Sequence, residues 1–253
     1  GGGAAVGLRA GATGLVLTEP AGVRPGPDGD DNRYEWGRWT SPPVPAGFPV
    51  AEVVPSWTAR TPDGCWIEVE LRGWHGDAPA TGWYTLGRWA ADDRTVRRAS
   101  VPGQRDPAAQ VDADTLVVGE ATVTGWQVRV TLLRPAGSDL GPALRTVGAV
   151  ASGSPAVGPP DAPPTPDRPG ADGRGARGVV LDVPRYSQRL HGPQPRWGGG
   201  GGAWCSPTCT SMVLAFWDAA PPPERYAWVD PPGPRPVVVH AARHCYDHAY
   251  DGA

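Results

Sequence analysis

Residues 198–217 read GGGGGAWCSPTCTSMVLAFW, a glycine run followed by a segment whose apolar residues have helical spacing. These apolar residues recur three or four positions apart: Met212, Val213, Phe216 and Trp217. Such spacing predicts an α-helix with an apolar face. Pro207 fits the first turn of that helix, because the N–H that proline lacks would have no partner there. The helix is therefore expected to begin near Cys205.

Cys205 would face the unpaired backbone N–H groups at the helix start and the positive end of the helix macrodipole. Both favour the thiolate, which is the nucleophilic form of cysteine. The alternative is a buried structural cysteine, which is the commoner state of an isolated cysteine. Cys209 lies one turn past the helix start and is expected to pack rather than react.

Composition excludes several classes of function. The four cysteines form no Cys-x-x-Cys pair, so neither a structural zinc site nor a cofactor is predicted. A formal net charge of −3 provides no basic surface for nucleic acid, and no apolar run is long enough to span a membrane. All 23 basic residues are Arg, which is typical of a GC-rich bacterial genome. Export from the cell is expected, with a leader absent from the residues given.

The stretch LDVPRYSQ at residues 181–188 and the stretch WCSPT at residues 204–208 together resemble the peptidase C39-like group of cysteine peptidases. The resemblance covers roughly residues 178–253. It implies an α+β papain-like fold, with Cys205 as the nucleophile and Gln188 as the donor to the oxyanion. A neutral amide suits that role because it stabilises negative charge without titrating. Ser206 departs from the pattern, since glycine is common at that position.

The same resemblance implies a catalytic His followed by an Asp or Asn much later in the chain. Only about half of such a domain follows residue 178, so the catalytic His is expected beyond Ala253. His240, His244 and His248 are spaced four apart and would form a stripe on one helix. That stripe is expected to be structural, with a metal site or a catalytic base as the less favoured alternatives. His191 is expected at the surface.

Alternating polar and apolar residues before position 150 predict antiparallel strands. In Cys65–Arg72 the inward residues are Ile67, Val69 and Leu71. In Trp126–Leu132 the inward set contains the residues Trp126, Val128, Val130 and Leu132. These patterns predict a β-sandwich. Residues 179–183 predict a further short strand that ends at Pro184.

The fold class is therefore predicted as an all-β sandwich followed by the N-terminal part of an α+β papain-like domain. Its segments are a flexible N-terminal segment (1–30), the β-sandwich (31–150), a Pro/Gly-rich linker (151–177) and a partial peptidase domain (178–253). Pro- and Gly-rich composition favours an extended linker, and a long loop within one domain is the alternative.

The leading functional hypothesis is a cysteine peptidase that hydrolyses a peptide or protein substrate, in some cases one associated with the cell wall. The alternative is a β-sandwich protein that binds cell-wall carbohydrate or peptide and has an inactive peptidase-like remnant. Twelve tryptophans motivate this alternative, because exposed Trp side chains stack on sugars and peptides. Core filling is the commoner use of Trp and is the favoured interpretation for most of them.

Overall fold

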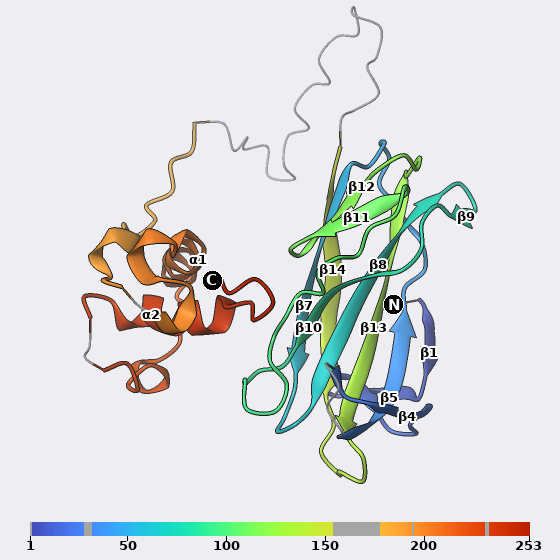
Figure 1. The fold of residues 1–253 in the computed structure, drawn as a ribbon, viewed down its shortest axis with the longest axis horizontal. Helices are drawn as coiled ribbons and strands as arrows, with labels where there is room; N and C mark the ends of the chain where they lie inside the picture. The colour runs from blue at the N-terminus through green and yellow to red at the C-terminus, as the bar shows by residue number, and fades with distance from the viewer. Residues whose placement is uncertain (1, 28–31, 154–177, 194, 231–232) are drawn as a thin grey trace, which may run out of the picture. The chain divides into compact units, whose positions relative to one another are not determined.

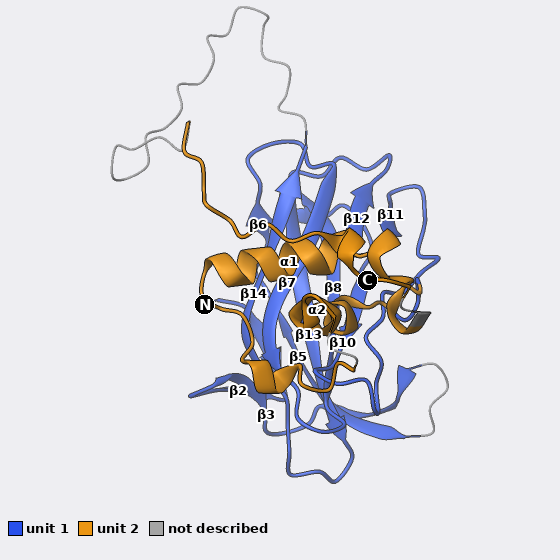
Figure 2. Cartoon of the chain, turned by 90° about the vertical axis from the view of Figure 1, so that its left-hand side faces the viewer, with its two compact units in different colours: residues 1–157, 248–250 blue, residues 158–247, 251–253 orange. Residues whose placement is uncertain are grey.

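A computed structural model of the chain describes residues 2–27, 32–153, 178–193, 195–230 and 233–253. Its contacts divide the chain into two compact units (Figure 2). Unit 1 comprises residues 1–157 and 248–250, and unit 2 comprises residues 158–247 and 251–253. Most of the predicted linker, residues 154–177, lies outside the described residues, and the last strand of unit 1 extends to Ser152.

Unit 1 is built from strands that run antiparallel to their neighbours (Figure 1). The strands are β1 (Ala4–Val6), β2 (Leu8–Gly11), β3 (Gly14–Leu17), β4 (Gly22–Pro25), β5 (Arg33–Thr40), β6 (Val44–Pro45), β7 (Glu52–Arg60), β8 (Trp66–His75), β9 (Ala78–Pro79), β10 (Tyr84–Trp89), β11 (Ala109–Asp112), β12 (Thr115–Val118), β13 (Gly125–Pro135) and β14 (Ala143–Ser152). One sheet has the order β1-β5-β13-β8-β10, with β4, β6 and β9 attached. The other has the order β11-β12-β7-β14-β3-β2.

The long pairing of β8 with β13 sets the core of unit 1. Its register places Ile67 opposite Leu132, Val69 opposite Val130, and Leu71 opposite Val128, all on one face. These side chains are buried, and the other sheet contributes buried residues to the same hydrophobic cluster: Val53, Leu116 and Leu144. Both sheets therefore pack on a shared core. The prediction of a β-rich first domain with these inward residues is confirmed.

The N-terminal segment differs from the prediction that residues 1–30 are flexible. It contains β1 to β4, which pair with both sheets. Leu8 pairs with Leu17 in the β2–β3 hairpin, and β3 pairs in turn with β14. Gly14 has φ +123°, and an added Cβ there would lie 2.1 Å from the Leu144 carbonyl oxygen. Gly14 is thus required for close approach between strands rather than being a sign of flexibility. Pairing with distant strands overrides the weak β propensity of this segment.

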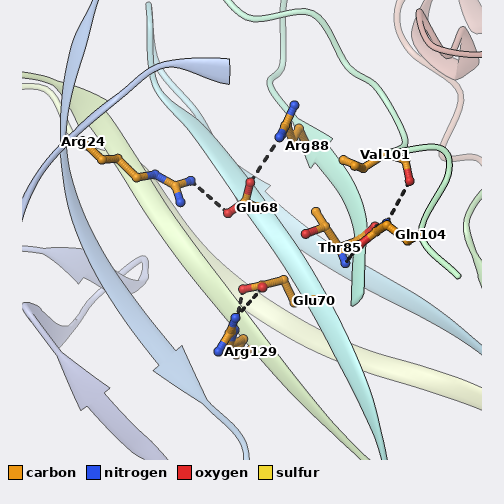
Figure 3. Close-up of polar contacts among 8 residues, drawn as sticks. All are labelled: Arg24, Glu68, Glu70, Thr85, Arg88, Val101, Gln104 and Arg129. Carbon is orange, nitrogen blue, oxygen red and sulfur yellow. Dashed lines mark hydrogen bonds and ion pairs between the residues drawn. The ribbon is translucent and has the colours of Figure 1, made fainter. Parts of the chain in front are cut away.

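The face of β8 opposite the core is also covered. Glu68 and Glu70 point to this face, yet both are buried. Glu68 accepts hydrogen bonds from Arg24 of β4 (2.9 Å) and Arg88 of β10 (3.3 Å). Glu70 accepts two from Arg129 of β13, each of 2.5 Å (Figure 3). These ion pairs connect four strands of the sheet.

Tryptophan rings extend this charged layer, because arginine guanidinium groups stack on several of them. The pairs are Arg24 over Trp66, Arg38 over Trp36, Arg72 over Trp74 and Trp83, and Arg129 over Trp83. The distances from guanidinium carbon to ring centroid are 4.3–5.2 Å, which is the range of cation–π contacts. These four tryptophans therefore have partners within unit 1, although of the four only Trp66 is fully buried.

In its described residues, unit 2 contains two α-helices, α1 (Cys205–Phe216) and α2 (Pro236–Cys245), and four 3-10 helices: η2 (Gln188–Leu190), η3 (Pro195–Trp197), η4 (Gly200–Gly202) and η5 (Pro223–Arg225). Its core is the buried cluster of Trp197, Trp204, Val229, Val238, Val239 and Ala242. The helix predicted from Cys205 is confirmed. None of the described helices is long and apolar enough to cross a bilayer.

The short strand predicted over residues 179–183 does not form. Val180 has 93% of its surface exposed, and Val179 and Leu181 are exposed as well. An extended segment becomes a strand only where a neighbour supplies backbone partners, and none of the described residues of unit 2 forms a strand. The α+β papain-like architecture of this unit stays a prediction.

Replacing Glu70 by Gln tests the charged layer of unit 1. We expect Glu70→Gln to lower the free energy of unfolding by about 2 kcal/mol, because the half-buried Arg129 guanidinium would lose its counter-ion. Urea unfolding followed by tryptophan fluorescence measures this change. Glu52→Gln, at the exposed end of β7, is the matched control and should change the free energy by less than about 0.5 kcal/mol. Equal effects of the two substitutions would contradict this role for Glu70.

The thiol of Cys65 provides a pH-dependent test of the same unit. Burial raises the pKa of Cys65 to about 11, an effect that Asp63 increases and Arg134 opposes. A raised pKa in the folded state stabilises unit 1 fully below the ordinary value of 9.0, and this stabilisation is lost as pH rises from about 9 to 11. Cys65→Ser should remove that loss of stability in thermal melts recorded between pH 8 and 11. Identical pH profiles for Cys65→Ser and the parent chain would refute the assignment.

Candidate functional site

The start of α1 is anchored by a buried tryptophan. Trp204 is fully buried, and its indole N–H donates a hydrogen bond of 2.6 Å to the carbonyl oxygen of Trp197. The Thr208 N–H donates to the Trp204 carbonyl oxygen over 3.3 Å, which links the anchor to the first turn of the helix. Because Trp204 immediately precedes Cys205, the position of the cysteine backbone is fixed by the core of unit 2.

Cys205 is the first residue of α1, as predicted, and it is exposed. Its own N–H donates to the Ala203 carbonyl oxygen. No side-chain hydrogen bond caps this helix within the described residues, and its first turn has no acidic residue. Cys205 therefore stands in the first turn of α1, whose backbone N–H groups no side chain of the described residues caps. An exposed thiol at this position is also accessible to a substrate.

Gln188 lies at the start of η2 and is connected to the glycine run. Its side-chain Nε2 donates a hydrogen bond of 3.0 Å to the carbonyl oxygen of Gly201, four residues before Cys205. An added Cβ on Gly201 would lie 2.2 Å from the His191 carbonyl oxygen and 2.4 Å from that of Gln188. Only glycine fits so close an approach. The glycine run thus lets the segment that leads into Cys205 pack on the turn that bears Gln188.

His191 corrects one prediction, because it is buried rather than at the surface. Its ring lies against Trp204, with centroids 5.5 Å apart. Burial lowers the pKa of His191, and the nearby charge of Arg235 lowers it further. Its position follows from the approach of Gly201 to the backbone of η2, a tertiary contact that the polar flanking sequence does not reveal. The signal that could have revealed this contact is the unbroken glycine run.

The predicted histidine stripe is only partly formed. His240 and His244 lie on α2 with ring centroids 4.4 Å apart, whereas His248 lies beyond the end of that helix at Cys245. Tyr246 is not helical, so the four-residue spacing breaks before His248. The Trp228 indole N–H donates to His240 Nδ1 over 3.4 Å.

The surroundings of His240 are aromatic and cationic. Burial lowers the pKa of His240, and the positive charges of Arg225 and Arg243 lower it further. Among the described residues, no group of three or more His, Cys, Asp and Glu side chains is placed to hold a metal ion. In the same residues, no hydrogen bond connects the Cys205 thiol with a histidine. The described structure therefore does not bring together a complete Cys–His pair.

The remaining surface of α1 also differs from expectation. Cys209 was expected to pack rather than react, but its side chain is exposed. The helix buries Pro207, Thr208 and Ser211, while Val213 and Trp217 are exposed. The small and polar side chains on the buried face allow α1 to pack closely in unit 2. Cys209 lies on the other face, with the larger apolar residues. Cys205 and Cys209 are thus both exposed on one helix, so the reactivity of their thiols can be compared directly.

Comparison with known protein families identifies both parts of the chain. Residues 1–152 match the family described as the peptidase C39 N-terminal domain, and residues 180–253 match the Peptidase_C39 like family. No curated protein and no solved structure matches the chain. The first match covers more than half of the 253 residues, and the second includes Gln188 and Cys205. The chain therefore belongs to the peptidase C39-like family.

Proposed function

We propose that this protein is a cysteine peptidase in which Cys205 is the nucleophile and Gln188 stabilises the oxyanion. The observation that chiefly supports this proposal is the hydrogen bond from Gln188 to Gly201, which attaches the amide to the segment leading into Cys205. Family membership supports the peptidase class. The substrate class that follows is a peptide or protein amide.

In the proposed reaction the Cys205 Sγ attacks the carbonyl carbon of the scissile amide. The electron pair of the carbonyl moves to its oxygen, which becomes negatively charged. Collapse of this intermediate expels the amine, which takes up the proton that the Cys205 thiol gave to the general base, and leaves a thioester on Cys205. Water then attacks the thioester carbonyl, the C–S bond breaks, and the acid is released as the Cys205 thiol is restored.

Gln188 has the donor that this oxyanion requires. A side-chain amide carries two N–H donors, and the bond to Gly201 uses one of them. Within the described residues no second acceptor is hydrogen-bonded to Nε2, so the other donor is available to the substrate oxygen. The Gly201 bond would orient the amide before substrate binds, which is the condition for strong stabilisation of a developing charge.

The proposed reaction also requires a general base, and neither His191 nor His240 is proposed for that role. His191 is packed against Trp204, and His240 is held by Trp228 in the aromatic part of unit 2. We propose that the base is a histidine outside residues 1–253, within the papain-like fold that the family resemblance implies. In this proposal the nucleophile Cys205 lies within residues 1–253, whereas the histidine that transfers the proton lies outside them.

The reactivity of Cys205 relative to Cys209 tests the nucleophile. We expect iodoacetamide at pH 6 to alkylate Cys205 at least about tenfold faster than Cys209, because only Cys205 lies at the helix N-terminus. Peptide mass spectrometry after short exposures gives both rates in one sample. Cys209→Ser should leave the Cys205 rate unchanged. Equal rates for these two exposed thiols would show that Cys205 is not an activated nucleophile.

An activated ester tests the role of Gln188 without requiring the unidentified base. We expect Gln188→Ala to slow acylation of Cys205 by p-nitrophenyl acetate about 100-fold, because this reaction passes through an oxyanion. Alkylation by iodoacetamide forms no oxyanion and should keep its rate. Arg189→Ala, an exposed neighbour on η2, is the matched control. Parallel slowing of both reactions by Gln188→Ala would indicate a structural role instead.

A further inference from the structure

The sheet of unit 1 that contains β7 has a notch along that strand. On one side, β14 pairs with β7 along its length, from Glu52 to Arg60. On the other side, β12 pairs with β7 only at Glu52 and Val53. From Val54 to Arg60, therefore, β7 has one strand partner among the described residues and presents its second edge unpaired.

No loop takes the place of the missing strand in the described part of the chain. The backbone hydrogen bonds that link loops and neighbouring elements do not involve Pro55–Ala59. Pro55 is consistent with an open edge, since a strand proline is tolerated where the ladder needs no donor. The residues beyond it keep their N–H groups. An unpaired edge of this kind presents donors and acceptors in the alternation that another peptide backbone matches.

A cavity of about 440 Å³ lies along the same stretch of β7. Its lining residues are Pro55, Ser56, Trp57, Thr58, Ala59 and Trp89. Trp57 and Trp89 are half-buried, and no guanidinium group stacks on either ring in the described residues. They differ in this respect from the four arginine-stacked tryptophans of unit 1. Both rings pack partly against the hydrophobic core of unit 1, and both also line this cavity beside the unpaired backbone.

The side chains of β7 show what an added strand would require. Val53, Pro55, Trp57 and Ala59 are the more buried members, and the residues between them are exposed. A strand that continues this sheet would have the same alternation, with apolar side chains toward the cavity and polar ones toward solvent. A glycan could stack on the tryptophans but would leave the regular backbone edge unmatched.

We propose that an extended peptide of a partner protein binds along Val54–Arg60 as an additional strand. Its backbone pairs with the open edge of β7, and its alternate apolar side chains enter the cavity between Trp57 and Trp89. This is β-augmentation, in which main-chain hydrogen bonds provide affinity and side-chain pockets provide specificity. The surface lies within unit 1 and does not depend on the chemistry of Cys205.

Hydrogen–deuterium exchange on the full chain locates the binding surface. The probe is a fluorescein-labelled heptapeptide of alternating Thr and Val residues. It should slow exchange of those amides of Val54–Arg60 that point away from β14 at least about tenfold, with no change in the edge strands β2 and β11. Absence of protection at β7, or protection at β2 or β11 instead, would overturn the proposal. Protection of β7 by chitohexaose but not by the peptide would overturn it in favour of a glycan site.

Backbone methylation of the peptide tests the mode of binding. Only one edge of a bound strand faces β7, so the isomers N-methylated at odd and at even positions should differ at least about tenfold in affinity by fluorescence anisotropy. Equal affinities would exclude strand addition. Self-pairing of β7 in a dimer is a competing outcome, and peptide-resistant dimerisation in analytical ultracentrifugation would overturn the proposal.

A protein variant provides the independent control. Trp57→Ala should weaken binding of the heptapeptide about tenfold, because it removes one wall of the cavity. Trp39→Ala is matched to it, since Trp39 is also half-buried on the same core but does not line this cavity. Circular dichroism establishes that both variants are folded, and the exchange measurement above decides the matter if either is not. Equal weakening by the two substitutions would contradict the assigned position.

Discussion

Unit 1 depends on the long antiparallel pairing of β8 with β13. Because their register aligns Ile67 with Leu132 and Val69 with Val130, one face of this ribbon is uniformly apolar and becomes the floor of the core. The opposite face must then bury the intervening acidic side chains. Glu68 and Glu70 are accommodated there because arginines from β4, β10 and β13 reach them. The ion pairs are thus a consequence of the same register that builds the core.

A comparable constraint operates in unit 2, where the backbone approach at Gly201 is closer than any side chain permits. This approach brings together three features that are separated in the sequence: the amide of Gln188, the buried ring of His191 and the segment that enters α1. Burial of Trp204 holds the other end of that segment. Position and orientation at a candidate nucleophile are thus determined by a glycine and a tryptophan that take no part in the chemistry.

Local patterns were sufficient for the elements whose structure is determined locally. The two-residue period of β8 and β13 predicted their inward residues, and Pro207 in the first turn predicted where α1 begins. Features that depend on distant partners were not predictable in this way. Strands β1 to β4 form because β5 and β14 accept them, and His191 is buried because Gly201 approaches it. Residues 179–183 have a strand-like composition but no described partner strand.

The surroundings of the tryptophans also could not be predicted from the sequence. In sequence they are alike, yet Trp36, Trp66, Trp74 and Trp83 have arginine neighbours, whereas Trp57 and Trp89 border an open cavity. Natural sheets usually protect an open edge with charged side chains, proline or a bulge. On the open edge of β7, Pro55 and Arg60 are residues of the protective kind, but residues 56–59 between them include neither a charge nor a proline, and the register shift nearby falls on β14. The unprotected stretch between Pro55 and Arg60, beside two half-buried aromatic rings that line a cavity, has the properties of a binding surface rather than of a closed sheet edge.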